Sequence, residues 1–171
     1  IKSVIIGTLW LSRTHRCMRL FFLFLLILTL VSCSQYENPK SFFDKGNYKK
    51  AFSLWLPLAN DGDSFAQNYI GIQYYLGLGI DRNLGLAKKW FEKASIGGSA
   101  DAQHNLGLMY ENGDYLEQDL IVASMWFYVA SQNGSTNAKK RIQRLLNDDK
   151  IFPNQYNHAK ELAKQYLSVE N

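Results

Sequence analysis

Residues 90–102 read WFEKASIGGSADA, and residues 126–138 read WFYVASQNGSTNA. The second copy begins 36 residues after the first. When residues 63–98 are placed on residues 99–134 without a gap, twelve of the 36 positions are identical, and most of these hold Gly, Ala or an aromatic residue. Self-similarity at a period of about 20–50 residues is the signature of a repeat architecture. The chain therefore contains two full copies of one structural unit.

Each unit predicts two helices joined by a short loop. In the first helix, apolar residues recur at a spacing of four and give one buried face. Side-chain oxygens before each helix can accept hydrogen bonds from its first turn, and glycines after it favour a left-handed end. The predicted boundary residues of the two units are Asp63 and Ser99, Gly77 and Gly113, Asn83 and Asp119, and Gly98 and Gly134.

The same register extends beyond the two full units. Residues 42–62 hold a partial unit with a short helix before Gly46 and a second helix at 47–60, in which Pro57 predicts a kink. Residues 135–168 hold two further helices that we expect to cap the array, because the end of a repeat stack needs a covering element. The predicted domain spans residues 42–168 and is an all-α, right-handed solenoid of antiparallel helix pairs.

The order of small and aromatic residues in the unit resembles the Sel-one-like repeat (SLR) family, relatives of the tetratricopeptide repeats (TPR). The residues that carry the resemblance are Ala102, Leu106-Gly107, Tyr110, Gly113, Ala123, Trp126-Phe127, Ala130-Ser131 and Gly134. The loop Gly77-Leu78-Gly79-Ile80 fits the family pattern, but its counterpart is Gly113-Asp114-Tyr115-Leu116. We therefore expect the second loop to turn differently. The resemblance implies a TPR-like superhelix that serves as an adaptor or scaffold.

The first 33 residues predict a targeting segment. Met18-Arg19 precedes twelve uncharged residues, 20–31, which suit a secretory signal peptide and are fewer than the roughly 20 that a transmembrane helix needs. Leu30-Val31-Ser32-Cys33 resembles the lipobox of bacterial lipoproteins, which implies that residues 18–33 are the signal and that Cys33 is the lipidated residue. The alternative is an uncleaved signal anchor in which Cys33 has no role.

Three smaller expectations follow for this end of the chain. The sequence opens at Ile1, and Met18 is a more natural start, so residues 1–17 are interpreted as an upstream over-extension of the reading frame. Residues 34–41 are expected to be a linker. Ser34 after the cysteine, by resemblance to other lipoproteins, favours the periplasmic face of the outer membrane in a bacterial cell envelope.

The charge of the chain gives no indication of a nucleic-acid partner. The whole sequence has 19 Lys and Arg against 15 Asp and Glu, but four of the basic residues and none of the acidic ones lie in residues 1–33. The remainder is formally neutral, and a neutral domain has no general attraction for a phosphate backbone. We expect no nucleic-acid partner.

The sequence also offers no evident chemistry. His15 lies in the expected targeting segment, His104 and His158 have no neighbouring Cys, His or Asp at a metal-ligand spacing, and no nucleophile motif occurs. The basic residues 139–141 and Arg144 are interpreted as a solvated helix face. We therefore expect no catalytic residue, no metal and no cofactor.

One face of each first helix is the predicted partner-binding groove. Helical geometry of about 100° per residue places one set of residues opposite the buried face, where TPR relatives have their concave groove. The alternative is that Ile72 and Leu108 only pack between adjacent first helices. The predicted groove residues are Phe65, Asn68, Ile72 and Tyr75 in the first unit, and Asp101, His104, Leu108 and Glu111 in the second.

These observations predict a non-enzymatic protein–protein interaction module, tethered to the bacterial envelope by a lipid on Cys33, with a protein or peptide partner. The alternative from another class is an envelope enzyme, or an accessory to one, that acts on cell-wall peptides. A third possibility is a structural envelope lipoprotein without a discrete partner.

The anchor makes the first testable prediction. Replacing Cys33 by serine removes the thiol that accepts the lipid, so the Cys33→Ser chain should carry no label from a fatty-acid analogue and should accumulate as an unprocessed precursor. Labelling and gel mobility of the two chains in the same bacterial host measure this. Persistent labelling of Cys33→Ser would show that the lipid is attached elsewhere.

Overall fold

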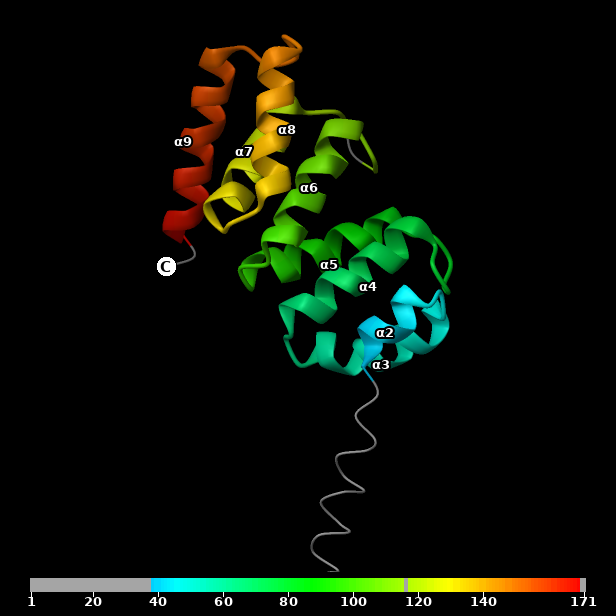
Figure 1. Cartoon of the computed structure of the whole chain (residues 1–171). Helices are drawn as coiled ribbons and strands as arrows, with labels where there is room; N and C mark the ends of the chain where they lie inside the picture. The colour runs from blue at the N-terminus through cyan, green and yellow to red at the C-terminus, as the bar shows by residue number, and fades with distance from the viewer. Residues whose placement is uncertain (1–37, 116, 170–171) are drawn as a thin grey trace, which may run out of the picture. The chain divides into compact units, whose positions relative to one another are not determined.

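A computed structural model describes residues 38–115 and 117–169, and the compact unit that they form begins at Pro39. The signal peptide, Cys33 and residues 1–17 lie outside the described residues, as do residues 34–37 of the expected linker. The described part of the chain is all-helical, which confirms the predicted fold class (Figure 1). Its helices are α2 (Pro39–Asp44), α3 (Tyr48–Asn60), α4 (Ser64–Leu76), α5 (Leu84–Ile96), α6 (Ala100–Asn112), α7 (Leu120–Gln132), α8 (Thr136–Asn147) and α9 (Pro153–Val169).

The helices stack in chain order. Contacts are most extensive within the pairs α4–α5 and α6–α7, and α3, α5 and α7 each pack against the first helix of the next unit. The last helix departs from this order, because α9 packs chiefly on α7, where the Tyr166 ring lies 4.9 Å from the ring of Trp126. Trp126 is buried under this ring, whereas Trp90 at the same position of the preceding unit is half-buried.

The predicted helix caps are confirmed. Asp63 accepts a hydrogen bond from the backbone N–H of Ala66 at 2.8 Å, and Asn83, Ser99, Asp119 and Ser135 cap their helices in the same way. Gly77 and Gly113 both take the left-handed conformation that ends the first helix. At the beginning of the array, α2 starts at Pro39, inside the expected linker, because proline is favoured in the first turn of a helix. The helix α3 contains Pro57 and continues to Asn60.

A glycine on each first helix receives an aromatic ring from its partner helix. A Cβ atom on Gly71 would lie 2.6 Å from the ring of Phe91, and one on Gly107 would lie 2.5 Å from the ring of Phe127. Both rings are almost fully buried. No other residue type allows the two backbones of a unit to lie this close, so these contacts set the distance between the paired helices.

The expectation that the second loop turns differently is wrong. Tyr115 has a φ of 71°, nearly that of Gly79 at 76°, and the same backbone hydrogen bonds close both loops. In the first loop, Gly79 is needed because a Cβ there would lie 2.7 Å from the backbone nitrogen of Lys49. In the second, the residue that corresponds to Lys49 is Gly85, and the ring of Tyr115 lies against it. The glycine at this contact is thus in the loop in the first case, Gly79, and on the helix beneath the loop in the second, Gly85.

Within residues 38–115 and 117–169, no helix is both long enough and apolar enough to span a membrane.

The glycine–aromatic contact makes the second prediction. In Gly107→Ala the added methyl group must displace the buried Phe127 ring, and overpacking of this kind costs about 1–3 kcal/mol. Gly85→Ala is the matched control, because the nearest atoms to its Cβ would be those of the Tyr115 ring, at 3.2 Å, and this side chain is 63% exposed and able to move. That variant should be neutral or more stable by up to about 1 kcal/mol, as expected for glycine to alanine in a helix. Urea unfolding of both variants decides, and equal stabilities would contradict the role given to Gly107.

Candidate functional site

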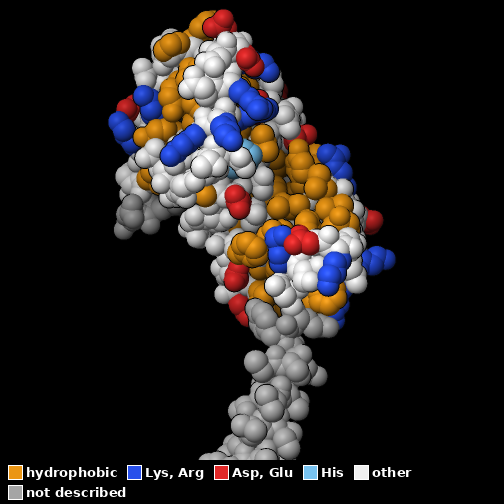
Figure 2. Space-filling model, in the orientation of Figure 1, with side chains coloured by type: hydrophobic (Ala, Val, Ile, Leu, Met, Phe, Trp, Pro, Cys, Tyr) orange, Lys and Arg blue, Asp and Glu red, His pale blue; other side chains and the backbone are white. Residues whose placement is uncertain are grey.

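The first helices α4, α6 and α8 share one face of the domain, and the predicted groove residues lie on it. Phe65 is 52% exposed, Asp101 is exposed, and Ile72, Tyr75, His104 and Leu108 are half-buried. On the surface drawn in Figure 2, Lys and Arg side chains gather over α8, and a continuous apolar area lies over α4. Asn68 and Glu111 depart from the expectation of an open face, because they are only 3% and 6% exposed.

Asn68 is buried because it pairs with the next unit. Its side-chain oxygen accepts a hydrogen bond of 3.0 Å from the amide nitrogen of Asn105 on α6. A buried polar group needs such a partner, since an unsatisfied one costs about 1–3 kcal/mol. The residue therefore serves to hold α4 against α6.

Glu111 is buried for the same kind of reason. Its carboxylate accepts two hydrogen bonds from Arg141 on α8, Nε at 2.6 Å and the terminal nitrogen at 2.7 Å. These bonds raise the pKa of Arg141 above its ordinary value. Arg141 was expected on a solvated face, so this ion pair corrects the sequence interpretation. The two residues join α6 to α8 much as the asparagine pair joins α4 to α6.

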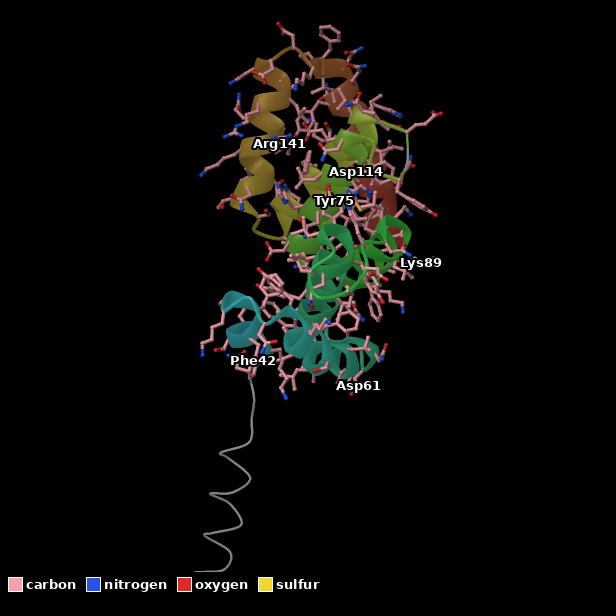
Figure 3. All side chains as sticks on the ribbon, turned by 90° about the vertical axis from the view of Figure 1, so that its right-hand side faces the viewer. Phe42, Asp61, Tyr75, Lys89, Asp114 and Arg141 are labelled. Carbon is pink, nitrogen blue, oxygen red and sulfur yellow. The ribbon has the colours of Figure 1, made fainter. Side chains whose placement is uncertain are left out.

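Tyr75 makes a third link between units. Its hydroxyl donates a hydrogen bond of 2.5 Å to Asp114, at the beginning of the loop after α6, and Figure 3 shows the two side chains close together. Burial of the ring and this bond raise the pKa of the phenol. Asn112 also donates to Asp114, at 3.0 Å.

Between α4 and α6 lies a hollow of about 250 Å³, which we name the apolar hollow. Ile72 and Leu108 line opposite sides of it, so they lie between adjacent first helices without closing the gap. Leu76, the last residue of α4, is 55% exposed at its edge. The residues that line the apolar hollow are Ile72, Tyr75, Leu76, Phe91, Asn105 and Leu108.

Between α6 and α8 lies a second hollow of about 230 Å³, which we name the basic hollow. It contains three cationic side chains, and Leu108 belongs to both hollows, which therefore adjoin. Burial lowers the pKa of His104 here, the charge of Arg141 lowers it further, and nearby Asp101 and Glu111 oppose both effects. The lining residues of the basic hollow are His104, Leu108, Asn137, Lys140, Arg141 and Arg144.

Seven lining residues were not among the predicted groove residues: Leu76, Phe91, Asn105, Asn137, Lys140, Arg141 and Arg144. Asn137, Lys140 and Arg144 lie 36 residues after Asp101, His104 and Leu108, so continuing the register into the third first helix would have found them. Leu76 and Asn105 lie beside predicted positions on their helices and are exposed to the hollow only because of where the neighbouring helix sits.

The two hollows differ in their lining, which is chiefly apolar in one and chiefly polar and basic in the other. Among the described residues, no group of three or more His, Cys, Asp or Glu side chains could hold a metal ion. The larger space near Glu111, about 550 Å³, is lined by the carboxylate that Arg141 already pairs. What the surface offers instead is an apolar hollow and a basic one, side by side on a stack of helix pairs, which is the form of an α-solenoid interaction module.

Comparison with known proteins agrees with this class. The family model described as Sel1 repeat matches residues 64–99 and 100–135. A crystal structure of a Sel1 repeat protein from Oxalobacter formigenes is 30% identical, with a TM-score of 0.59, over 63% of this chain and 44% of that one. A second, of c5321, a protective antigen present in uropathogenic Escherichia coli strains and displaying an SLR fold, is 27% identical, with a TM-score of 0.68, over 76% of this chain and 28% of that one.

Comparison with curated proteins gave no match. This chain spans less than half the length of either solved structure. The two repeats and the two structural matches support the SLR family. Sel1 repeats generally mediate protein–protein interaction, and proteins built from them are generally not enzymes.

The link between Glu111 and Arg141 makes the third prediction. Arg141→Gln leaves a nearly buried carboxylate without its cation, and breaking a buried pair from one side costs about 3–5 kcal/mol, less here because the arginine is about one-third exposed. We expect a loss of about 2 kcal/mol in the free energy of unfolding. Arg144→Gln, one turn further along α8 and exposed, should change it by less than about 0.5 kcal/mol. Equal losses in urea unfolding would show that the ion pair does not stabilise the contact between units.

Proposed function

We propose that the face formed by α4, α6 and α8 binds a segment of a partner protein and that the chain acts as a non-enzymatic adaptor. The observation that carries the proposal is the apolar hollow, an open space of about 250 Å³ between α4 and α6. Apolar side chains that remain in contact with water, on a surface bordered by polar residues, are typical of binding sites.

The links between units support this assignment, because they make the face rigid before a partner arrives. Asn68 with Asn105, Glu111 with Arg141, and Tyr75 with Asp114 each join one unit to the next. A surface that is already ordered loses less conformational entropy when it binds. The groove residues thus have two roles. The buried polar ones fix the distance between neighbouring first helices, and the exposed apolar ones are free to contact a partner.

The proposal extends to the location of the protein. A signal peptide and a lipid on Cys33 would hold the module at a bacterial envelope membrane, on the periplasmic face of the outer membrane. The support is the apolar run and the lipobox-like Leu30-Val31-Ser32-Cys33. One acyl chain binds a membrane only marginally, whereas two or more anchor a protein stably, and the lipoprotein pattern implies three.

Site-specific photocrosslinking in cells makes the fourth prediction. A photoreactive amino acid at Leu76 or Phe65 of the full chain should give one discrete protein adduct, because both side chains are exposed on the proposed face. Ile96 is the matched control: it is a large apolar residue, 67% exposed, but it lies at the end of α5 and lines neither hollow. Immunoblots of cross-linked cells show the adducts. Equal adducts from Ile96, or none from Leu76 and Phe65, would contradict the assignment.

A further inference from the structure

Corresponding positions on the three first helices change in chemical character along the domain. On α4 they are largely apolar or aromatic, on α6 they are mixed, and on α8 they are polar and basic. In chain order the three sets are Phe65, Asn68, Ile72 and Tyr75; Asp101, His104, Leu108 and Glu111; and Asn137, Lys140, Arg144 and Asn147. The chemical character of the proposed face therefore changes along the domain, from apolar at α4 to basic at α8.

The cations at the basic end are not neutralised from within the domain. Arg141 is committed to Glu111, but Lys140 and Arg144 are exposed and form no ion pair with any residue that the structure describes. Besides Glu111, two acidic groups act on residues of this region: Asp101 on α6 acts on His104, and Asp148, the C-cap residue of α8, acts on Arg141. Neither of them lines the basic hollow. Two positive charges without an ion-pair partner among the described residues thus border a hollow whose α6 side is formed by His104 and Leu108.

Building on the proposed function, we propose that this face recognises an extended peptide segment that places an apolar side chain in the apolar hollow and acidic side chains beside Lys140 and Arg144. The apolar hollow supplies the affinity, since removing apolar area from water is the larger favourable contribution. Exposed charge pairs contribute only about 0.2–1 kcal/mol each, so the basic end selects among apolar segments and speeds their association.

The geometry of the face limits the spacing between the two features of the segment. The two hollows adjoin at Leu108, so we take their centres to be about one helix spacing apart, and helix spacings are on the order of 10 Å. An extended chain covers about 3.3 Å per residue. The apolar residue and the first acidic residue of the segment should therefore be about three positions apart.

A polyanion such as a nucleic acid fits the face less well. Binding to a phosphate backbone depends on many cations, each of which releases counterions. The basic hollow offers only two cations that have no ion-pair partner among the described residues. It also borders an apolar surface, where phosphates would lose water of hydration and gain no hydrogen bond in exchange. The combination of an apolar hollow with a small basic one favours a peptide with both features.

The test is a phage-display selection of random peptides. The target is the full chain, solubilised in detergent and immobilised on a support. Enriched peptides should combine a large apolar residue with Asp or Glu at a spacing of about three, in one order along the peptide. The best of them, synthesised with a fluorophore, is then titrated by fluorescence anisotropy. Lys140→Glu with Arg144→Glu replaces two attractions by two repulsions and should weaken binding about tenfold or more.

The matched control is Lys89→Glu with Lys139→Glu, which changes the net charge equally. Both lysines are exposed and line neither hollow, and Figure 3 labels Lys89 on α5, well away from Arg141. This variant should bind within about twofold of the wild type, apart from a uniform effect of net charge that added salt removes.

The outcomes separate this inference from the proposed function. Suppose that the peptide binds to the wild type, that Leu76→Glu abolishes this binding, and that charge reversal on α8 does not change it. The partner is then not acidic, and only the inference about its chemistry is wrong. Enrichment of acidic peptides without an apolar residue, or equal weakening in the control, also overturns it. If no peptide is enriched, the inference is wrong, and crosslinking from Leu76 and Phe65 still decides separately whether the face binds a protein.

Discussion

The distance between the two helices of a unit is the constraint on which the rest of the structure depends. Phe91 and Phe127 occupy space that a Cβ on Gly71 or Gly107 would need, so the ring from α5 packs directly on the backbone of α4, and the ring from α7 packs directly on that of α6. Because the same contact recurs after 36 residues, the two units have nearly the same shape and stack in register. The openings between α4, α6 and α8 are consequences of that regular spacing.

Much of this was predictable from the sequence, because it depends on residues close together in the chain or one period apart. Caps such as Asp63 and Ser99 act within a single turn, and the role of Gly107 follows from its identity in both copies. The burial of Asn68 and Glu111 was not predictable in this way. It depends on which side chain the neighbouring unit presents, an asparagine in one case and an arginine in the other, and a period of 36 residues does not determine that choice.

The loop after the first helix shows a related limit. The pattern Gly-Asp-Tyr differs from Gly-Leu-Gly, which suggested a different turn, yet Tyr115 adopts the φ of Gly79. At each contact between this loop and the helix beneath it, one of the two residues is a glycine, and either side can supply it. In the first unit the loop does so, against Lys49, and in the second the helix does so, at Gly85. A requirement shared between two positions is invisible when each position is compared only with its own counterpart.

The end of the array explains why the chemistry of the face changes there. In the first two units, the residues that correspond to Lys140 lie against the following first helix: Asn68 bonds to α6, and His104 lies beside Arg141 on α8. After α8, the chain turns back and α9 packs chiefly on α7, so within the described residues no first helix follows α8. The position that contacts the next first helix inside the array is therefore exposed to solvent on α8, the last first helix. Long cationic side chains tolerate such a position, and the same openness leaves Lys140 and Arg144 able to meet acidic groups of a partner.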